Sequence, residues 1–188
     1  MTQSNFQHTL VTGQEEKLYR KIINAWCMYD WANSAFATTV MAAVLPTFYS
    51  AVAAATLSPD PERARVLASS YWGYTNTIAM LLVALAAPVL GAIADHSAAK
   101  KRFLGGFASL GILFTTLLVL VGTGDWLMAS LFYVLGRIGF AAANIFYDSL
   151  LPHIARPEDI DWVSAKGYAL GYLGGGLLLA VNLAMILK

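Results

Sequence analysis

Residues 103–121 read FLGGFASLGILFTTLLVLV, nineteen positions without a charged side chain. The run begins directly after Lys100, Lys101 and Arg102, and it ends before the polar residues 122–125. Because a helix rises 1.5 Å per residue, about 20 apolar residues cross the ~30 Å hydrocarbon core of a bilayer. The stretch therefore predicts a membrane-spanning helix.

Four similar apolar stretches flank this run and are separated from it by short polar breaks. They cover about residues 25–55, 71–94, 126–147 and 167–187. All are too long for strands, and the strands of a membrane barrel would alternate between apolar and polar residues. We therefore expect an all-α, polytopic membrane protein with five transmembrane helices. The first stretch exceeds the length of a span, so its helix should tilt or project beyond the bilayer. The residues 59–63, with two prolines and three charges, predict an exposed loop.

The composition favours the same fold class. Of the 188 residues, 58% are apolar and 12% are charged, against about 25% charged in a typical soluble domain. The mean hydropathy is +0.60. A small soluble domain could not cover so much apolar surface, whereas the lipid bilayer removes the need to cover it. The formal net charge of +1 gives no basic field, so we expect no nucleic-acid partner.

The basic residues predict the orientation of the chain. We divide it into a polar cytoplasmic tail at 1–24 and a transmembrane helical bundle at 25–188, and no secretory signal precedes the first apolar stretch. With the amino terminus inside, the inner segments hold Lys17, Arg20, Lys21, Lys100, Lys101, Arg102, Arg156 and Lys166, and the outer ones hold Arg63, Arg65 and Lys188. This excess favours a cytoplasmic amino terminus. We expect a multi-pass protein of the membrane, which in a bacterium is the cytoplasmic (inner) membrane.

Arg137 lies near the middle of the stretch 126–147, where its guanidinium cannot easily reach either surface. Asn144 and Asp148 share its helical stripe, but Asp148 is roughly 16 Å away along the axis and cannot pair with it. Arg137 therefore needs a partner on another helix, a substrate anion or water. We expect Arg137 to face a cavity, with an ion pair between helices as the alternative, and we interpret Asp148 as a gate or cap residue.

Asp30 is the only charged residue of the stretch 25–55, and Asn33 and Ser34 follow it on the same helical face. It is either an interfacial carboxylate wetted by lipid headgroups or part of a polar facet that lines an aqueous pathway. On the second interpretation, the substrate pathway consists of Asp30, Asn33, Arg137 and Asn144.

Glycines recur along the stretch 167–187. Gly167, Gly171 and Gly175 form two overlapping Gly-xxx-Gly pairs, which let another helix approach closely. We expect these glycines to serve helix packing, with a local hinge as the lesser alternative. Pro46 and Pro88 are expected kink sites in the first two helices.

Nothing in the sequence indicates catalysis. No serine or cysteine has a histidine at a catalytic spacing, and no glycine-rich loop is followed by a lysine and a hydroxyl residue. The single cysteine, Cys27, lies in an apolar run and is expected to be a packed core thiol. We therefore expect a protein that is not an enzyme and that holds no cofactor and no metal.

The loop between the second and third stretches reads GAIADHSAAKKR over residues 91–102. It resembles the signature of the major facilitator superfamily at the same inner loop. The matching residues are Gly91, Asp95, Lys100, Lys101 and Arg102. His96 and Ala98 stand where the signature has a basic residue and a glycine.

Other stretches resemble a particular branch of that superfamily. YDWANSAF at 29–36 and GYALGYLGG at 167–175 look like the vacuole-effluxer-like branch. Residues 137–142 resemble the helix-four arginine motif with its spacing altered by one. Residues 167–176 resemble the helix-five antiporter motif, with Tyr172 in place of its proline.

The resemblance implies secondary transport of a small solute by alternating access, with coupling to a proton or ion gradient. The branch suggests an amino acid or similar metabolite as the solute. The implied inner gate consists of Gly91, Asp95, Lys100, Lys101, Arg102 and Asp148.

The resemblance covers five helices of a fold built from two six-helix halves, so we expect an amino-terminal fragment or half-size form. Such a chain should associate with itself or with a separate carboxy-terminal half, and should not concentrate a solute alone. The alternative is a non-transporting membrane subunit or truncated product that associates through glycine-rich helix five.

Overall fold

A computed structural model describes residues 3–187, so predictions about the first two residues and Lys188 lie outside the described part. Five helices in this part are long and apolar enough to cross a membrane. They run over Gly13–Ala53, Pro61–His96, Lys100–Leu120, Trp126–Ile154 and Pro157–Ile186. The predicted fold class, an all-α protein with five membrane-spanning helices, is confirmed.

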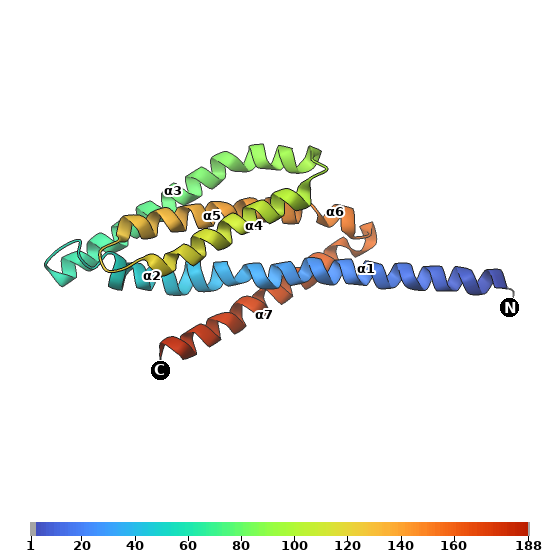
Figure 1. The fold of residues 1–188 in the computed structure, drawn as a ribbon, viewed down its shortest axis with the longest axis horizontal. Helices are drawn as coiled ribbons and strands as arrows, with labels where there is room; N and C mark the ends of the chain where they lie inside the picture. Colours follow the sequence, from blue (N-terminus) through green and yellow to red (C-terminus); the bar gives the residue numbers. More distant parts are fainter. Residues whose placement is uncertain (1–2, 188) are drawn as a thin grey trace.

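The elements follow one another with short connections (Figure 1). In chain order they are α1 (Gln3–Ala35), the π-helical η1 (Phe36–Val44), α2 (Leu45–Phe48), the π-helical η2 (Tyr49–Ala53), α3 (Pro61–His96), α4 (Lys100–Leu117), η3 (Leu118–Leu120), α5 (Trp126–Asp148), α6 (Leu151–Ile154), η4 (Pro157–Asp159) and α7 (Ile160–Ile186).

The first span is one long helical rod. Residues 3–24, expected as a polar tail, continue as the first part of α1, and Figure 1 shows this part extending past the other helices. Near Pro46 the rod changes to wider π-helical turns, in which the Leu45 N–H donates to the Val40 carbonyl five residues back. A proline inside an α-helix crowds the carbonyl four residues before it, so the change of helix type accommodates Pro46 without ending the rod.

The second span begins earlier than the sequence indicated. α3 starts at Pro61, because the Asp60 side chain accepts a 3.1 Å hydrogen bond from the Glu62 N–H and a proline suits the first helical position. The expected loop at 59–63 was therefore wrong for its last three residues, which are helical. α3 then continues through Pro88, and Figure 1 shows it bending along its length.

Two sets of helices make up the bundle. α5 packs against α3 and α4, and α1 packs against α7. α4 and α5 approach at two glycines, since a Cβ atom on Gly139 would lie only 2.5 Å from the Gly111 nitrogen. Trp26, Cys27 and Tyr147 join α1 to α5 in a buried cluster, in which the predicted core thiol of Cys27 is fully buried.

Candidate functional site

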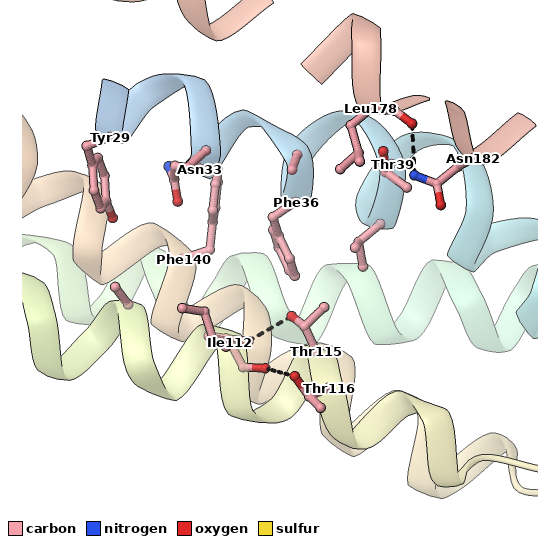
Figure 2. A pocket seen from close by; sticks show the side chains of 15 residues that line it. Tyr29, Asn33, Phe36, Thr39, Ile112, Thr115, Thr116, Phe140, Leu178 and Asn182 are labelled. Atoms are coloured by element: carbon pink, nitrogen blue, oxygen red, sulfur yellow. Dashed lines mark hydrogen bonds between the residues drawn. The ribbon is translucent and has the colours of Figure 1, made fainter. Parts of the chain in front are cut away.

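A cavity of about 480 Å³ lies between α1 with η1, α4, α5 and α7 (Figure 2). Most of its wall is apolar and includes the rings of Phe36 and Phe140, whose centroids are 4.9 Å apart. The polar residues that line it are Tyr29, Asn33, Thr39, Thr115, Thr116 and Asn182. The cavity therefore presents hydroxyl and amide groups on an apolar background, which is typical of small-molecule sites.

Helical periodicity places these residues together. Tyr29, Asn33, Phe36 and Val40 follow spacings of four, three and four, so they lie on one face of the first rod and all line the cavity. Opposite them, Gly111 allows α4 to lie close to α5, because its missing side chain faces the Phe140 backbone nitrogen. The rod and the α4–α5 pair thus form two facing walls.

Two hydroxyl groups on the cavity wall have no partner in the described structure. Thr39 is 8% exposed, and its Oγ1 forms no hydrogen bond. The Tyr29 hydroxyl is also buried without a partner. Buried polar groups are nearly always hydrogen-bonded, and leaving one unpaired costs about 1–3 kcal/mol. Both hydroxyl oxygens are covered by the protein in this conformation, so each is an unsatisfied buried group.

Three of the other polar side chains already donate to their own helices (Figure 2). Each donates to the carbonyl four residues before it: Thr115 Oγ1 to Gly111 at 2.7 Å, Thr116 Oγ1 to Ile112 at 2.8 Å, and Asn182 Nδ2 to Leu178 at 2.8 Å. These three side chains therefore differ from Thr39 and Tyr29, whose hydroxyls have no hydrogen-bond partner.

The polar stripe predicted on α5 faces the first rod. Asn33 Nδ2 donates to Asn144 Oδ1 at 2.6 Å, so the structure brings these two predicted pathway residues together. Arg137 lies farther along the same interface, where its Nη1 contacts Met41 Sδ at 3.5 Å and donates to the Tyr133 hydroxyl at 3.1 Å. None of the ion pairs in the described residues includes Arg137.

Arg137 is thus joined to a buried polar chain rather than to a carboxylate. The Tyr133 hydroxyl, which accepts from Arg137, donates in turn to Asn76 Oδ1 on α3 at 2.7 Å. Tyr133 itself is 1% exposed. The chain of hydrogen bonds therefore links α5 to α3 through a buried ring.

The predicted packing glycines lie against α1. A Cβ atom on Gly167 would lie 2.6 Å from the Trp26 ring, and one on Gly171 would lie 2.6 Å from Asp30 Oδ2. Thr38 Oγ1 donates to the Gly175 carbonyl at 3.1 Å. Asp30, a predicted pathway residue, is therefore half-buried at the α1–α7 contact, and it does not line the cavity.

The predicted gate residues mostly gather at one end of the bundle, which we call the Asp95 end. Asp95, Lys100, Lys101 and Arg102 line an open pocket of about 860 Å³, together with His96 and His153. The Lys100 ammonium donates to the Ala94 carbonyl. Gly91 lies one turn earlier in α3 beside open space, and Asp148 is exposed at the end of α5. Neither of these two residues lines the pocket.

A polar contact outside the predicted set joins α1 to the segment before α7. Arg156 Nη2 donates to Glu16 Oε2 at 2.7 Å, and its guanidinium lies over the Tyr19 ring at 4.2 Å. The Tyr19 hydroxyl donates to Asp159 Oδ2 at 2.7 Å. We call these four residues the Glu16–Arg156 clasp. The hydrogen bond to Glu16 raises the pKa of Arg156.

The sequence analysis missed the residues that carry the free hydroxyls, Tyr29 and Thr39. Tyr29 and Phe36 lie one turn before and after Asn33 on the same helical face, so helical periodicity could have identified Tyr29. Thr39 gave no such signal, because its position on the wall depends on the π-helical turns of η1. Single threonines also occur commonly in apolar helices, where they bond to their own backbone.

The family model and the curated relatives that match this chain give consistent results. The family model described as "Vacuole effluxer Atg22 like" matches residues 19–161. The "Uncharacterized MFS-type transporter YxiO" of Bacillus subtilis (strain 168) is 38% identical over 171 residues, which cover 91% of this chain and 39% of that protein. "Autophagy-related protein 22" of Coccidioides immitis (strain RS) is 26% identical over 177 residues, covering 74% of this chain and 29% of that protein.

No solved structure matches the chain. The chain spans about two fifths or less of the length of the curated relatives it matches.

Proposed function

The chain belongs to the Atg22-like vacuole effluxer family of MFS-type transporters, and from this membership we propose that it takes part in secondary transport of a small solute across a membrane. The helices would open one binding site alternately to each side, without consuming ATP. The chain spans 39% of the Bacillus relative. That it contributes to the activity of a whole transporter is therefore part of what we propose.

The observation that carries the proposal is the cavity between the first rod and the α4–α5 pair. It lies between helices that belong to both sets of the bundle, α1 with α7 and α4 with α5. A site between two sets of helices can open when the sets tilt relative to each other.

The polar residues around the cavity have distinct roles in this proposal. Asn33 lines the cavity, and Asn144 holds its amide through the 2.6 Å hydrogen bond. Asp30 and Arg137 lie at neighbouring helix contacts. Movement of these helices would bring each residue to the solute pathway. Arg137 would act through its charge, since no carboxylate neutralises it within the described ion pairs.

We assign the Asp95 end to the cytoplasm and the amino terminus to the same side, in the cytoplasmic membrane if the cell is bacterial. Asp95, Lys100, Lys101 and Arg102 would then form gate charges on that side, with Asp148 nearby. The family resemblance in the sequence supports an amino acid or similar metabolite as the solute and coupling to a proton or ion gradient.

The alternative function is a non-transporting subunit that associates through the glycines of α7. The structure disfavours this route, because Gly167, Gly171 and Gly175 already pack against α1 inside the chain. Only Gly176 on this helix has open space beside it within the described residues. An associating surface would therefore have to lie elsewhere.

Reconstitution into liposomes tests the proposal. The 188-residue chain is reconstituted alone and after co-expression with the remaining part of a relative such as the Bacillus protein, and uptake of a radiolabelled amino-acid mixture is measured under an imposed proton gradient. We expect uptake only with the co-expressed part. Absence of uptake from both preparations would refute transport of these solutes.

A variant at Thr39 tests whether its hydroxyl is needed for transport. Thr39→Val keeps the shape but removes an unpaired buried hydroxyl, so the variant should unfold at a higher temperature while its uptake falls. Thr77→Val is the control, because the Thr77 hydroxyl is exposed on α3 and bonds to its own helix at 2.9 Å. Unchanged uptake by Thr39→Val would remove the cavity from the pathway.

A further inference from the structure

The open pocket at the Asp95 end has an excess of positive charge. Asp95 is the one acidic side chain among the described residues that line it. The basic side chains that line it are His96, Lys100, Lys101, Arg102 and His153. The last two lysines and the arginine are consecutive in the chain, so their formal charges repel one another. An anion in the pocket would offset this repulsion.

The protein itself supplies little that neutralises these cations. None of the ion pairs formed within residues 3–187 includes a side chain of the pocket. The Lys100 ammonium donates to the Ala94 carbonyl, which is an uncharged acceptor. Lys101 and Arg102 are exposed in the first turn of α4. Their charges are therefore open to a partner from outside the chain.

The pocket lies at a boundary between hydrocarbon and water. Residues 95–102 join the apolar stretches 71–94 and 103–121, each of which is long enough to cross the hydrocarbon core. The pocket therefore lies at the depth of the lipid headgroups, where the anionic groups are phosphates. This placement holds on either side of the membrane, so it does not depend on the assigned topology.

An exposed apolar stripe on α3 leads to the pocket. Leu85, Val89 and Ile93 recur every four residues, so they share one face of the helix, and all three are exposed. His96 follows Ile93 by three residues and continues this face into the pocket. α3 packs against α5 rather than α4, to which a short loop joins it at this end (Figure 1). A molecule with a phosphate in the pocket and an acyl chain along the stripe would contact both surfaces.

We propose that the pocket at the Asp95 end binds the phosphate group of an anionic membrane phospholipid, with Lys101 and Arg102 as its main cationic contacts. The planar guanidinium of Arg102 can donate to two phosphate oxygens at once, and the ammonium of Lys101 adds a compact charge. Basic pockets between membrane helices are suited to acidic headgroups for this reason. The site is separate from the cavity beside the first rod, and lipid binding there goes beyond the proposed function and does not require transport.

Native mass spectrometry of the purified 188-residue chain measures this binding. The chain in a mild detergent is titrated with phosphatidylglycerol and, separately, with phosphatidylcholine of the same acyl chains, whose phosphate is balanced by a choline cation. We expect the first phosphatidylglycerol to bind at least about fivefold more tightly, which is the contribution of a single surface cation. Equal affinity for the two lipids would overturn the proposal, and this comparison needs no variant to fold.

Two double variants locate the site. Lys101→Gln with Arg102→Gln should weaken phosphatidylglycerol binding roughly 25-fold, at about fivefold for each cation removed. Lys17→Gln with Lys21→Gln is the matched control, because these lysines are exposed on α1 and lie outside the pocket. The control should bind phosphatidylglycerol as the unmodified chain does. Equal weakening in both double variants would assign the binding to a general attraction of charge and overturn the proposal.

Soluble competitors distinguish a lipid phosphate from a free one. Inorganic phosphate and glycerol 3-phosphate are each added to the complex with phosphatidylglycerol. We expect neither to displace the lipid at an equal concentration, because neither has an acyl chain that can contact the stripe on α3. Displacement by either compound would indicate a site for free phosphate and overturn the assignment to a phospholipid.

Discussion

Asn33 and Asn144 join the first rod to α5 through a hydrogen bond of 2.6 Å between their side-chain amides. The contact continues in register away from the Asp95 end, where the rings of Phe36 and Phe140 pack at 4.9 Å and Arg137 contacts Met41. Since the two helices are antiparallel, successive turns of each meet successive turns of the other. The interface between the first rod and α5 thus forms part of the cavity wall, and it also holds polar contacts between the helices of the bundle.

The first prediction concerns this pair. Asn33→Ala and Asn144→Ala should each destabilise the bundle, and the double variant should be less destabilised than the sum of the two, with a coupling of about 1 kcal/mol. Unfolding in a detergent titration measures all three. Asn33→Ala combined with Asn182→Ala is the control and should be additive, because Asn182 bonds to its own helix. Additivity of the Asn33 and Asn144 variants would contradict the hydrogen bond.

The second prediction concerns the contact of α7 with α1. A Cβ atom on Gly174 would lie 2.6 Å from the Trp31 carbonyl oxygen, so Gly174→Ala must push two backbones apart. We expect a loss of about 1–3 kcal/mol, typical of overpacking. Gly176→Ala is the matched control, since nothing lies within 4 Å of that position, and it should be neutral or stabilising by up to about 1 kcal/mol. Equal stability of the two variants would argue against this packing.

The third prediction concerns Arg137. In the reconstituted transporter, Arg137→Ala should abolish most uptake, while Arg137→Lys should retain part of it because the charge remains and the planar guanidinium is lost. Membrane insertion should change little, since Arg137 contributes to no ion pair in the described residues. Uptake assays measure the loss of transport, and the yield of membrane-inserted protein measures insertion. Unchanged uptake by Arg137→Ala would assign the residue to structure alone.

The fourth prediction concerns topology. Ser97 and Thr123 lie in loops at opposite ends of α4, so single cysteines at these positions, with Cys27→Ala, should react with an impermeant reagent from opposite sides of the membrane. Ser97→Cys should react from the cytoplasmic side, as the basic residues indicate. Intact spheroplasts and inverted vesicles are compared. Reaction of both cysteines in the same preparation would refute the assigned topology.

The fifth prediction concerns the Glu16–Arg156 clasp. Glu16→Gln should speed amide hydrogen exchange in the turns of α1 around Glu16, and 1 M salt should have the same effect on the unmodified chain because salt screens exposed charges. Exchanging the two charges, Glu16→Arg with Arg156→Glu, should restore protection. Glu15→Gln is the control, because Glu15 is exposed and forms none of the described ion pairs. Equal exchange in the Glu15 and Glu16 variants would show that the clasp does not form.

The five spans could be predicted because hydropathy depends on local sequence alone. Residues 103–121 needed no knowledge of their neighbours to be recognised as a span. The charges at Glu62 and Arg63 predict a loop, whereas the capping hydrogen bond that Asp60 accepts from the Glu62 N–H starts α3 at Pro61. Charge indicates exposure, and exposed residues can be helical.

The site was harder to predict because it depends on contacts between helices. Periodicity placed Asn33 and Asn144 on polar faces, but only the structure pairs them. Asp30 and Arg137 stood out because charges are rare inside a membrane, yet the cavity is lined by uncharged groups that a search for charges overlooks. Thr39 lies on a π-helical turn, and helical periodicity and hydropathy do not predict that change of helix type.

The first rod is also a lever. The part from Gly13 to Ala53 has 41 residues and is therefore roughly 60 Å long, about twice the thickness of the hydrocarbon core. If the rod pivots by about ten degrees at Thr39, Glu16, which lies roughly 35 Å away along the helix, moves by roughly 6 Å. A small rotation beside the cavity would thus appear as a large displacement near Glu16, where a spectroscopic label would read it most easily.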